Sequence, residues 1–189
     1  MDGDKHTIRA KRQGLRARSA YKLEEINKRF KLMKPKDKVF DIGCWPGGWM
    51  VVAKKIVVDG YVLGIDKKEI EPIEGCDFIL GDIMDADILD KIEQKKFDVV
   101  LSDLSPKTTG IKEVDVEKSQ DLCLRALFIA NNVLKKNGNF LCKIFQGRGE
   151  EFLERLNKKF RKINIYKPLI SKKRSKEIYI IAKGFKNGN

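Results

Sequence analysis

Short apolar runs rich in β-branched residues recur along the chain, and segments with helical spacing separate them. Runs that are apolar throughout are typical of strands buried on both faces of a parallel sheet. Five of them occur in the first three quarters of the chain, at residues 38–43, 61–66, 77–82, 97–103 and 139–145. The spacing between them predicts helices over residues 49–58 and 116–136. The pattern therefore indicates repeating βα units.

The longer predicted helix is expected to bury one face and to end at a glycine. Its apolar face is formed by Cys123, Ala126, Leu127, Ala130 and Leu134. Basic residues fill its last turn, and Gly138 follows as a stop signal.

The two ends of the chain add different elements. Residues 163–166 and 177–185 read as strands joined by a segment too short for a crossover helix, which predicts an antiparallel pair. Near the N-terminus, Ser19 is expected to cap a helix with an apolar face, and residues 1–18 are expected to form a basic, mobile arm. No repeat or linker divides the chain, so we expect residues 1–189 to form a single domain.

Charge changes this picture, because it is unevenly placed. The chain has 189 residues and a formal net charge of +13. Residues 1–36 hold 12 basic and 4 acidic side chains, residues 37–154 hold 16 and 22, and residues 155–189 hold 12 and 1. Basic ends around an acidic middle suggest a surface for a polyanion, with nucleic acid as the first candidate. The alternative is that the lysine-rich ends are only solvated.

Several classes of protein fit poorly. The four cysteines are scattered and His6 is the only histidine, which argues against a zinc site. No apolar stretch reaches the length of a membrane span, and the charged N-terminus lacks the apolar core of a secretory signal. We expect reduced thiols in a cytoplasmic or organelle-matrix protein, the cytoplasm being favoured, with no metal and no membrane contact.

A glycine-rich loop follows the first predicted strand and enters a helix, at residues 41–49. Such loops bring backbone N–H groups close to a ligand, although many strand-to-helix turns need glycine for geometry alone. The loop lacks the spacing of dinucleotide-binding and P-loop motifs. Asp66 ends the second strand, at an offset typical of an acid that binds ribose hydroxyls. Asp82 and Asp103 end the next two strands, so three carboxylates are expected at one rim of the sheet.

Five motifs, in order along the chain, carry a family resemblance. They are RSAYKL (18–23), DIG with PGGW (41–43 and 46–49), LSDLSP with Gly110 (101–106), KIFQG (143–147) and RSKEIY (174–179). Over residues 18–185 the chain resembles the FtsJ/RrmJ family of RNA 2′-O-methyltransferases. The resemblance implies a Rossmann-like α/β methyltransferase fold, with a mostly parallel sheet, an antiparallel last strand and helices on both faces.

The resemblance also implies site residues. The family's catalytic group falls on Lys22, Asp103, Lys143 and Glu177. Its S-adenosyl-L-methionine positions fall on Gly43, Gly47, Gly48, Trp49, Asp66, Asp82 and Asp103. Trp45 departs from the family, which usually has a small residue there, and a bulky ring is expected to alter how the loop packs or covers the cofactor.

Taken singly, the catalytic candidates have ordinary explanations, as solvated or snorkelling lysines and a surface ion-pair partner. Lys143 is the exception, since it interrupts the apolar run FLCKIF and burying an unpaired charge is costly. We therefore expect it to have a partner. Its role is open between a general base and a cation that orients the hydroxyl.

Two basic clusters flank Lys22 and Glu177 in sequence and are expected to contact RNA phosphates. They consist of Arg9, Lys11, Arg12, Arg16 and Arg18 in the arm, and of Lys172, Lys173 and Arg174 before the last strand. The compact chain is similar to the minimal ribosomal RNA enzymes of the family, so we expect a monomer that methylates a uridine of large-subunit ribosomal RNA. The alternatives are transfer RNA anticodon-loop ribose, a small molecule, or a silent RNA-binding scaffold, with a dehydrogenase disfavoured.

Overall fold

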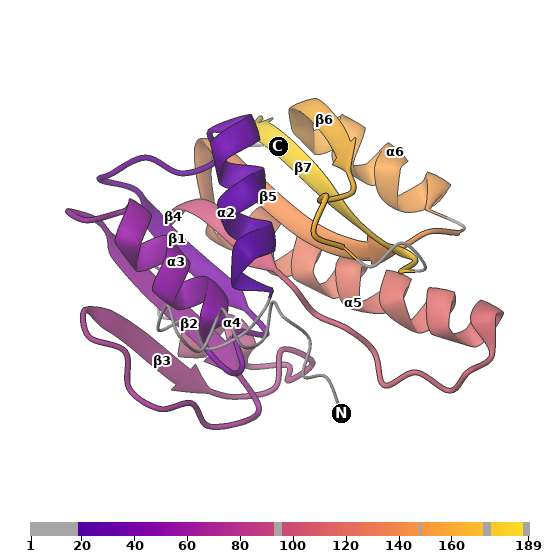
Figure 1. The fold of residues 1–189 in the computed structure, drawn as a ribbon, viewed down its shortest axis with the longest axis horizontal. Helices are drawn as coiled ribbons and strands as arrows, with labels where there is room; N and C mark the ends of the chain where they lie inside the picture. Colours follow the sequence, from indigo (N-terminus) through magenta and orange to yellow (C-terminus); the bar gives the residue numbers. More distant parts are fainter. Residues whose placement is uncertain (1–18, 93–95, 148, 172–174, 187–189) are drawn as a thin grey trace.

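One seven-stranded sheet organises the chain in the computed structural model, which describes residues 19–92, 96–147, 149–171 and 175–186 (Figure 1). The strands are β1 (Lys38–Ile42), β2 (Tyr61–Asp66), β3 (Cys76–Leu80), β4 (Phe97–Ser102), β5 (Leu134–Phe145), β6 (Phe160–Tyr166) and β7 (Glu177–Phe185). Their spatial order is β3-β2-β1-β4-β5-β7-β6. The first five are parallel, and β7 runs antiparallel to both β5 and β6. The predicted mixed sheet and its antiparallel C-terminal pair are confirmed.

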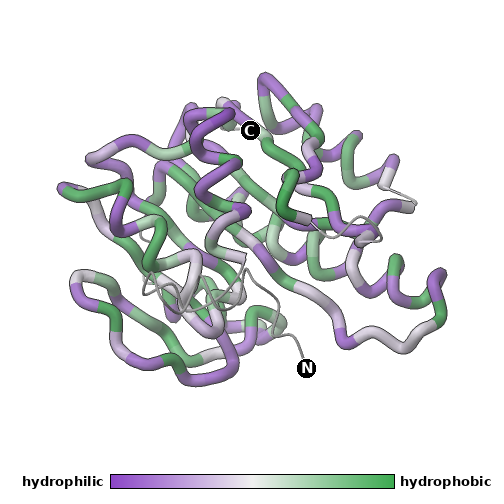
Figure 2. The backbone as a smooth tube through the Cα atoms, in the orientation of Figure 1, coloured by the Kyte–Doolittle hydropathy of each residue, from purple (hydrophilic) through white to green (hydrophobic). Residues whose placement is uncertain are grey.

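Helices cover both faces of this sheet, as the apolar strands require. On one face lie α2 (Ala20–Phe30) and α3 (Gly48–Ile56), and on the other lie α4 (Ile88–Lys91), α5 (Lys112–Val133) and α6 (Glu150–Lys159). Alternate strand residues feed the two layers of core, so that Leu101 packs toward α2 and α3 while Val100 packs toward α5. Figure 2 shows the apolar positions concentrated along the strands and the polar ones along the outer surfaces of the helices.

The C-terminal end predicted for the long helix is wrong. The helix α5 ends at Val133, and Leu134 already has the extended backbone of β5, paired with Phe97 of β4. Residues 135–138 therefore belong to a bulged strand, and the basic residues there do not lie in a helical turn. Gly138 does not stop the helix. A side chain at this glycine would crowd the main-chain oxygens of Lys135 and Asp98, because β4 approaches closely.

Smaller differences also occur at the ends of other elements. The strand predicted at residues 77–82 is β3 and ends at Leu80, so Asp82 lies two residues beyond it. Ser19 occupies the N-cap position of α2, but its side chain makes no capping hydrogen bond. Instead, its main-chain oxygen accepts a hydrogen bond from the amide N–H of Lys22.

Candidate active site

The carboxyl ends of the parallel strands meet at one edge of the sheet, where ligands bind in open α/β folds. The loops that follow β1, β2 and β4 leave this edge, and β5 ends there beside the first residues of β7. The N-terminal part of α2 lies over the same region (Figure 1). The site therefore draws its side chains from segments that are far apart in sequence.

Lys143 has the partner that its apolar surroundings require. Its side chain is 6% exposed, and its Nζ lies 3.1 Å from Oδ1 of Asp103. The same Nζ donates a hydrogen bond of 2.7 Å to the main-chain oxygen of Asp103. The charge of Lys143 is thus balanced by Asp103, at the point where the chain leaves β4.

Glu177 joins the second lysine to this pair. Lys22 donates from Nζ to Oε2 of Glu177 at 2.9 Å, and Oε1 of Glu177 lies 4.0 Å from Nζ of Lys143. Burial raises the pKa of Glu177, but the bond from Lys22 and the charge of Lys143 outweigh it, so that the pKa is lowered overall. The structure therefore brings all four predicted catalytic residues into one cluster.

Strand register explains why β5 and β7 deliver these groups together. Lys143 is directly opposite Tyr179, and Phe145 is opposite Glu177. Because side chains alternate along a strand, Glu177 and Tyr179 project from the same face of the sheet as Lys143. That face is covered by α2, which supplies Lys22.

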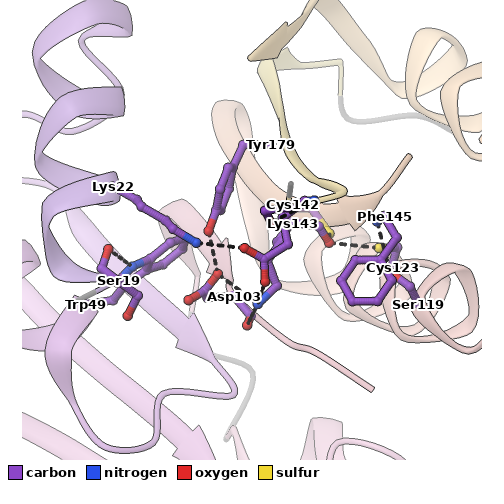
Figure 3. A network of polar contacts seen from close by, with 12 residues as sticks. Ser19, Lys22, Trp49, Asp103, Ser119, Cys123, Cys142, Lys143, Phe145 and Tyr179 are labelled. Atoms are coloured by element: carbon purple, nitrogen blue, oxygen red, sulfur yellow. Dashed lines mark hydrogen bonds and ion pairs between the residues drawn. The ribbon is translucent and has the colours of Figure 1, made fainter. Parts of the chain in front are cut away.

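Tyr179 belongs to the cluster although the sequence did not single it out. It is fully buried, and its hydroxyl donates to Oδ1 of Asp103 at 2.8 Å. Burial, together with the charge of Asp103, raises the pKa of Tyr179 well above its usual value, so the hydroxyl remains a donor. Figure 3 shows Lys22, Tyr179, Lys143 and Asp103 pointing toward one another. Asp103 is thus held by a lysine and a tyrosine together.

The predicted cofactor loop lies between β1 and α3. Gly43 and Gly47 have φ of 75° and 100°, in the left-handed region that favours glycine. A side chain at Gly43 would collide with the side chain of Leu104, so Leu104, in the segment after β4, packs directly against this loop. Gly48 begins α3, where the first N–H groups of a helix lack internal partners and are free to meet a ligand.

The side chain of Trp49 does not line this loop. It is buried, its Nε1–H donates to the main-chain oxygen of Ser19 at 2.9 Å, and its ring centroid lies 6.0 Å from that of Tyr179. Any contact of Trp49 with a cofactor would come from its main chain, while the indole joins the start of α2 to α3.

Asp41 is a buried carboxyl group that the sequence did not single out as a site residue. It lies in β1 with 1% exposure, and neither carboxylate oxygen has a hydrogen-bond partner among the described residues. Burial, and then the charges of Asp103 and Asp66, raise its pKa well above the usual value. The rim therefore holds a carboxylate suited to a cationic ligand.

Asp66 ends β2 as predicted, whereas Asp82 lies two residues beyond the end of β3, and both carboxylates accept hydrogen bonds from main-chain amides. Oδ2 of Asp66 accepts from the amide of Trp45 at 2.9 Å, and its Oδ1 accepts from the amide of Lys68 at 2.9 Å. Oδ1 of Asp82 accepts from the amide of Met84 at 3.0 Å. Both carboxylates are thus held in fixed orientations at the rim.

The predicted RNA-binding residues lie outside the described residues. They are Arg9, Lys11, Arg12, Arg16, Arg18, Lys172, Lys173 and Arg174. In the parts of the chain that the structure describes, every helix is too short or too polar to span a bilayer. In those parts, no three His, Cys, Asp or Glu side chains come together in a way suited to a metal ion.

Comparisons with known proteins give a consistent result. The family model described as FtsJ-like methyltransferase matches residues 15–185. A ribosomal RNA large subunit methyltransferase E of Desulfatibacillum aliphaticivorans is 45% identical over 98% of this chain and 92% of its own length. Its namesake in Methanosphaera stadtmanae is 42% identical, over 94% and 90%.

Solved structures agree with these matches. A ribosomal RNA methyltransferase of Plasmodium falciparum has a TM-score of 0.79 and 30% identity, over 90% of this chain and 98% of that one. A chain of a fibrillarin/Nop5p complex has a TM-score of 0.63 and 14% identity, over 88% and 83%, and shares the fold.

Proposed function

The chain belongs to the FtsJ-like methyltransferase family, and from that premise we propose that it transfers a methyl group to a ribose 2′-hydroxyl of large-subunit ribosomal RNA, at a uridine. One observation carries the proposal. Two lysines and two carboxylates from four separate segments, Lys22, Asp103, Lys143 and Glu177, form a continuous chain of ion pairs at the rim of the sheet. Such a cluster suits the alignment of a hydroxyl group and the management of its proton.

The donor that fits the rim is S-adenosyl-L-methionine, which supplies, when bound, a methyl group activated by a positively charged sulfur. Support comes from the carboxylates of Asp41, Asp66 and Asp103, and above all from Asp41, whose oxygens have no partner among the described residues. A buried carboxylate without a hydrogen bond is costly, and a cationic ligand relieves that cost. Gly43 and Gly47 let the loop backbone approach such a ligand.

Lys143 is proposed to hold the ribose hydroxyl. An ammonium has three N–H donors, and in Lys143 two of them are engaged by the main-chain oxygen and the carboxylate of Asp103. The third is left for the hydroxyl oxygen. Lys22 and Glu177, paired with each other, would position the ribose and fix the lysine network.

The hydroxyl oxygen gains the methyl group and loses its proton, either to an amine form of Lys143 or to solvent while Lys143 stays charged. Single-turnover rates against pH separate these roles, because a base must lose its own proton first, whereas an orienting cation must keep it. Lys143→Arg sharpens the test, since arginine keeps the charge and does not act as a base. Measurable transfer by this variant supports the orienting role.

The decisive experiment uses methyl-labelled S-adenosylmethionine with large ribosomal subunits and, separately, with total RNA, followed by mapping of the methylated nucleotide. We expect label on a uridine ribose of large-subunit RNA, and no transfer by Lys143→Ala despite normal folding and cofactor binding. Lys135→Ala is the matched control, because Lys135 lies on the same strand and forms a 2.8 Å ion pair with Asp98 of β4, away from the site. Near-normal turnover by Lys143→Ala would contradict the assignment, and label in transfer RNA would identify the alternative substrate.

We also propose that the basic ends hold the RNA, and that the chain acts as a single-domain monomer in the cytoplasm. The support for RNA contact is the concentration of positive charge in residues 1–36 and 155–189. Phosphate contacts make binding fall steeply with salt. Deleting residues 1–16 should weaken RNA binding more than cofactor binding, whereas equal losses would indicate a folding role.

A further inference from the structure

Trp45 is a large apolar side chain at the surface of the proposed cofactor loop. It is 51% exposed, whereas the neighbouring Cys44 and Trp49 are buried. An indole left half in water at this place is not needed to fill the core. Its position therefore calls for another explanation.

The main chain of Trp45 is fixed against the carboxylate proposed to bind ribose. Asp66 accepts the amide N–H of Trp45 on one oxygen and that of Lys68 on the other, both at 2.9 Å. Each carboxylate oxygen has a second acceptor site that remains for a ligand hydroxyl. A ribose bound to Asp66 would therefore share this carboxylate with the main-chain amides of Trp45 and Lys68.

The side chains of these two residues also meet. Nζ of Lys68 lies 4.2 Å from the centroid of the Trp45 ring, well inside the distance of a cation–π interaction. Such a contact favours one orientation of the ring. The ammonium thus lies over one face of an indole that is 51% exposed.

The geometry points to a positioning role for Trp45. Its indole, braced by Lys68, covers the ribose of the cofactor on Asp66 and slows release of the cofactor. This inference rests on the proposed use of S-adenosylmethionine, and it names Trp45 as the residue that slows release of the cofactor. An RNA base stacked on the ring is the competing occupant, but the hydrogen bond to Asp66 ties this loop to the ribose-binding carboxylate.

The test measures binding of S-adenosylhomocysteine, the product without the methyl group, to the full chain. Calorimetry gives the affinity, and displacement of radiolabelled S-adenosylhomocysteine by excess unlabelled ligand gives the release rate of every variant. We expect Trp45→Ala to bind about tenfold more weakly, or about 1.4 kcal/mol, through faster release. Trp45→Phe should recover part of the loss, and Lys68→Met should show an intermediate loss.

Phe128→Ala is the matched control. Phe128 is 47% exposed and lies 5.1 Å from the guanidinium carbon of Arg125, the same pairing of ring and cation on another face. It should leave affinity and release unchanged. Unchanged release in a folded Trp45→Ala would overturn the inference, as would a change confined to the KM for RNA. Asp66→Ala tests whether the ligand lies on Asp66. Unimpaired binding by this variant would overturn the inference about Trp45. If the wild-type protein binds neither S-adenosylmethionine nor S-adenosylhomocysteine, the proposed cofactor itself is refuted.

Discussion

Replacing Tyr179 with phenylalanine removes one hydroxyl and keeps the buried ring. That hydroxyl donates at 2.8 Å to the same oxygen of Asp103 that pairs with Lys143 at 3.1 Å. The change therefore takes away one of the contacts that fix Asp103, without removing any of the four proposed catalytic side chains.

The size of the effect follows from the charge of the acceptor and from burial. A hydrogen bond to a charged group contributes about 1.5–3 kcal/mol. Because Asp103 keeps its lysine, we take the lower part of that range, about 1.5–2 kcal/mol. For a chain of this length each kcal/mol corresponds to about 2–4 °C, so Tm should fall by about 3–8 °C. A carboxylate held less firmly also misplaces Lys143, and we expect kcat to fall about tenfold or more.

Thermal denaturation and single-turnover methyl transfer measure the two effects. Tyr61→Phe is the control, because the Tyr61 hydroxyl donates to Asp77 over the same 2.8 Å but at an exposed position outside the site. Tyr61→Phe should lower the free energy of unfolding by less than about 1 kcal/mol and leave turnover unchanged. Equal losses of stability in the two variants, with unchanged turnover in Tyr179→Phe, would show that the Tyr179 hydroxyl does not position Asp103.

Three further changes test other parts of the rim. Burial and neighbouring carboxylates raise the pKa of Asp41, so the folded chain keeps this proton where the unfolded chain loses it, and stability falls as pH rises above 3.8. Asp41→Asn should therefore gain stability over wild type between pH 4 and 7 in urea unfolding, yet bind cofactor more weakly; a relative loss at pH 7 would contradict this. The pKa of Glu177 is lowered from 4.5, so its stabilisation is complete above that value and is lost as pH falls. The stability lost in Glu177→Gln should accordingly be larger at pH 7 than at pH 4, and equal losses would count against the ion pairs. Gly43→Ala and Gly110→Ala both place a side chain at positive φ, costing about 1–2 kcal/mol each. Gly43→Ala should lose more stability than that and impair cofactor binding, because its side chain would collide with Leu104. Gly110→Ala should lose no more, because a side chain there meets no described atom within 4 Å.

Strand positions could be predicted well where pairing and composition agree. The runs at residues 61–66 and 177–185 coincide with β2 and β7, because each has a continuous buried centre, at residues 62–65 and 179–182. The end of α5 could not be predicted in this way. Leu134 fits the helical spacing, and its true conformation is decided by pairing with Phe97, which is distant in sequence. The helix α6 was not predicted, because only Phe152 and Leu156 are buried in it.

The catalytic group needed the resemblance, because local patterns cannot pair distant residues. Lys22 and Glu177 are 155 positions apart, and neither is unusual in its own segment. Lys143 was different, since a lysine inside an apolar strand signals a partner from composition alone. The partner, Asp103, could be anticipated only as another residue at the same rim.

Asp41 shows how that signal could have been used further. It interrupts the apolar run KVFDI as Lys143 interrupts FLCKIF, so the same rule marks both as buried charges. The structure then separates them, because Lys143 is neutralised within the fold, whereas Asp41 has no hydrogen-bond partner among the described residues. A paired buried charge is held in a fixed position by its partner. An unpaired carboxyl group lowers the stability of the free protein and favours binding of a ligand of opposite charge. The rim therefore combines a rigid group that handles the hydroxyl with a strained carboxylate that a cationic donor would relieve.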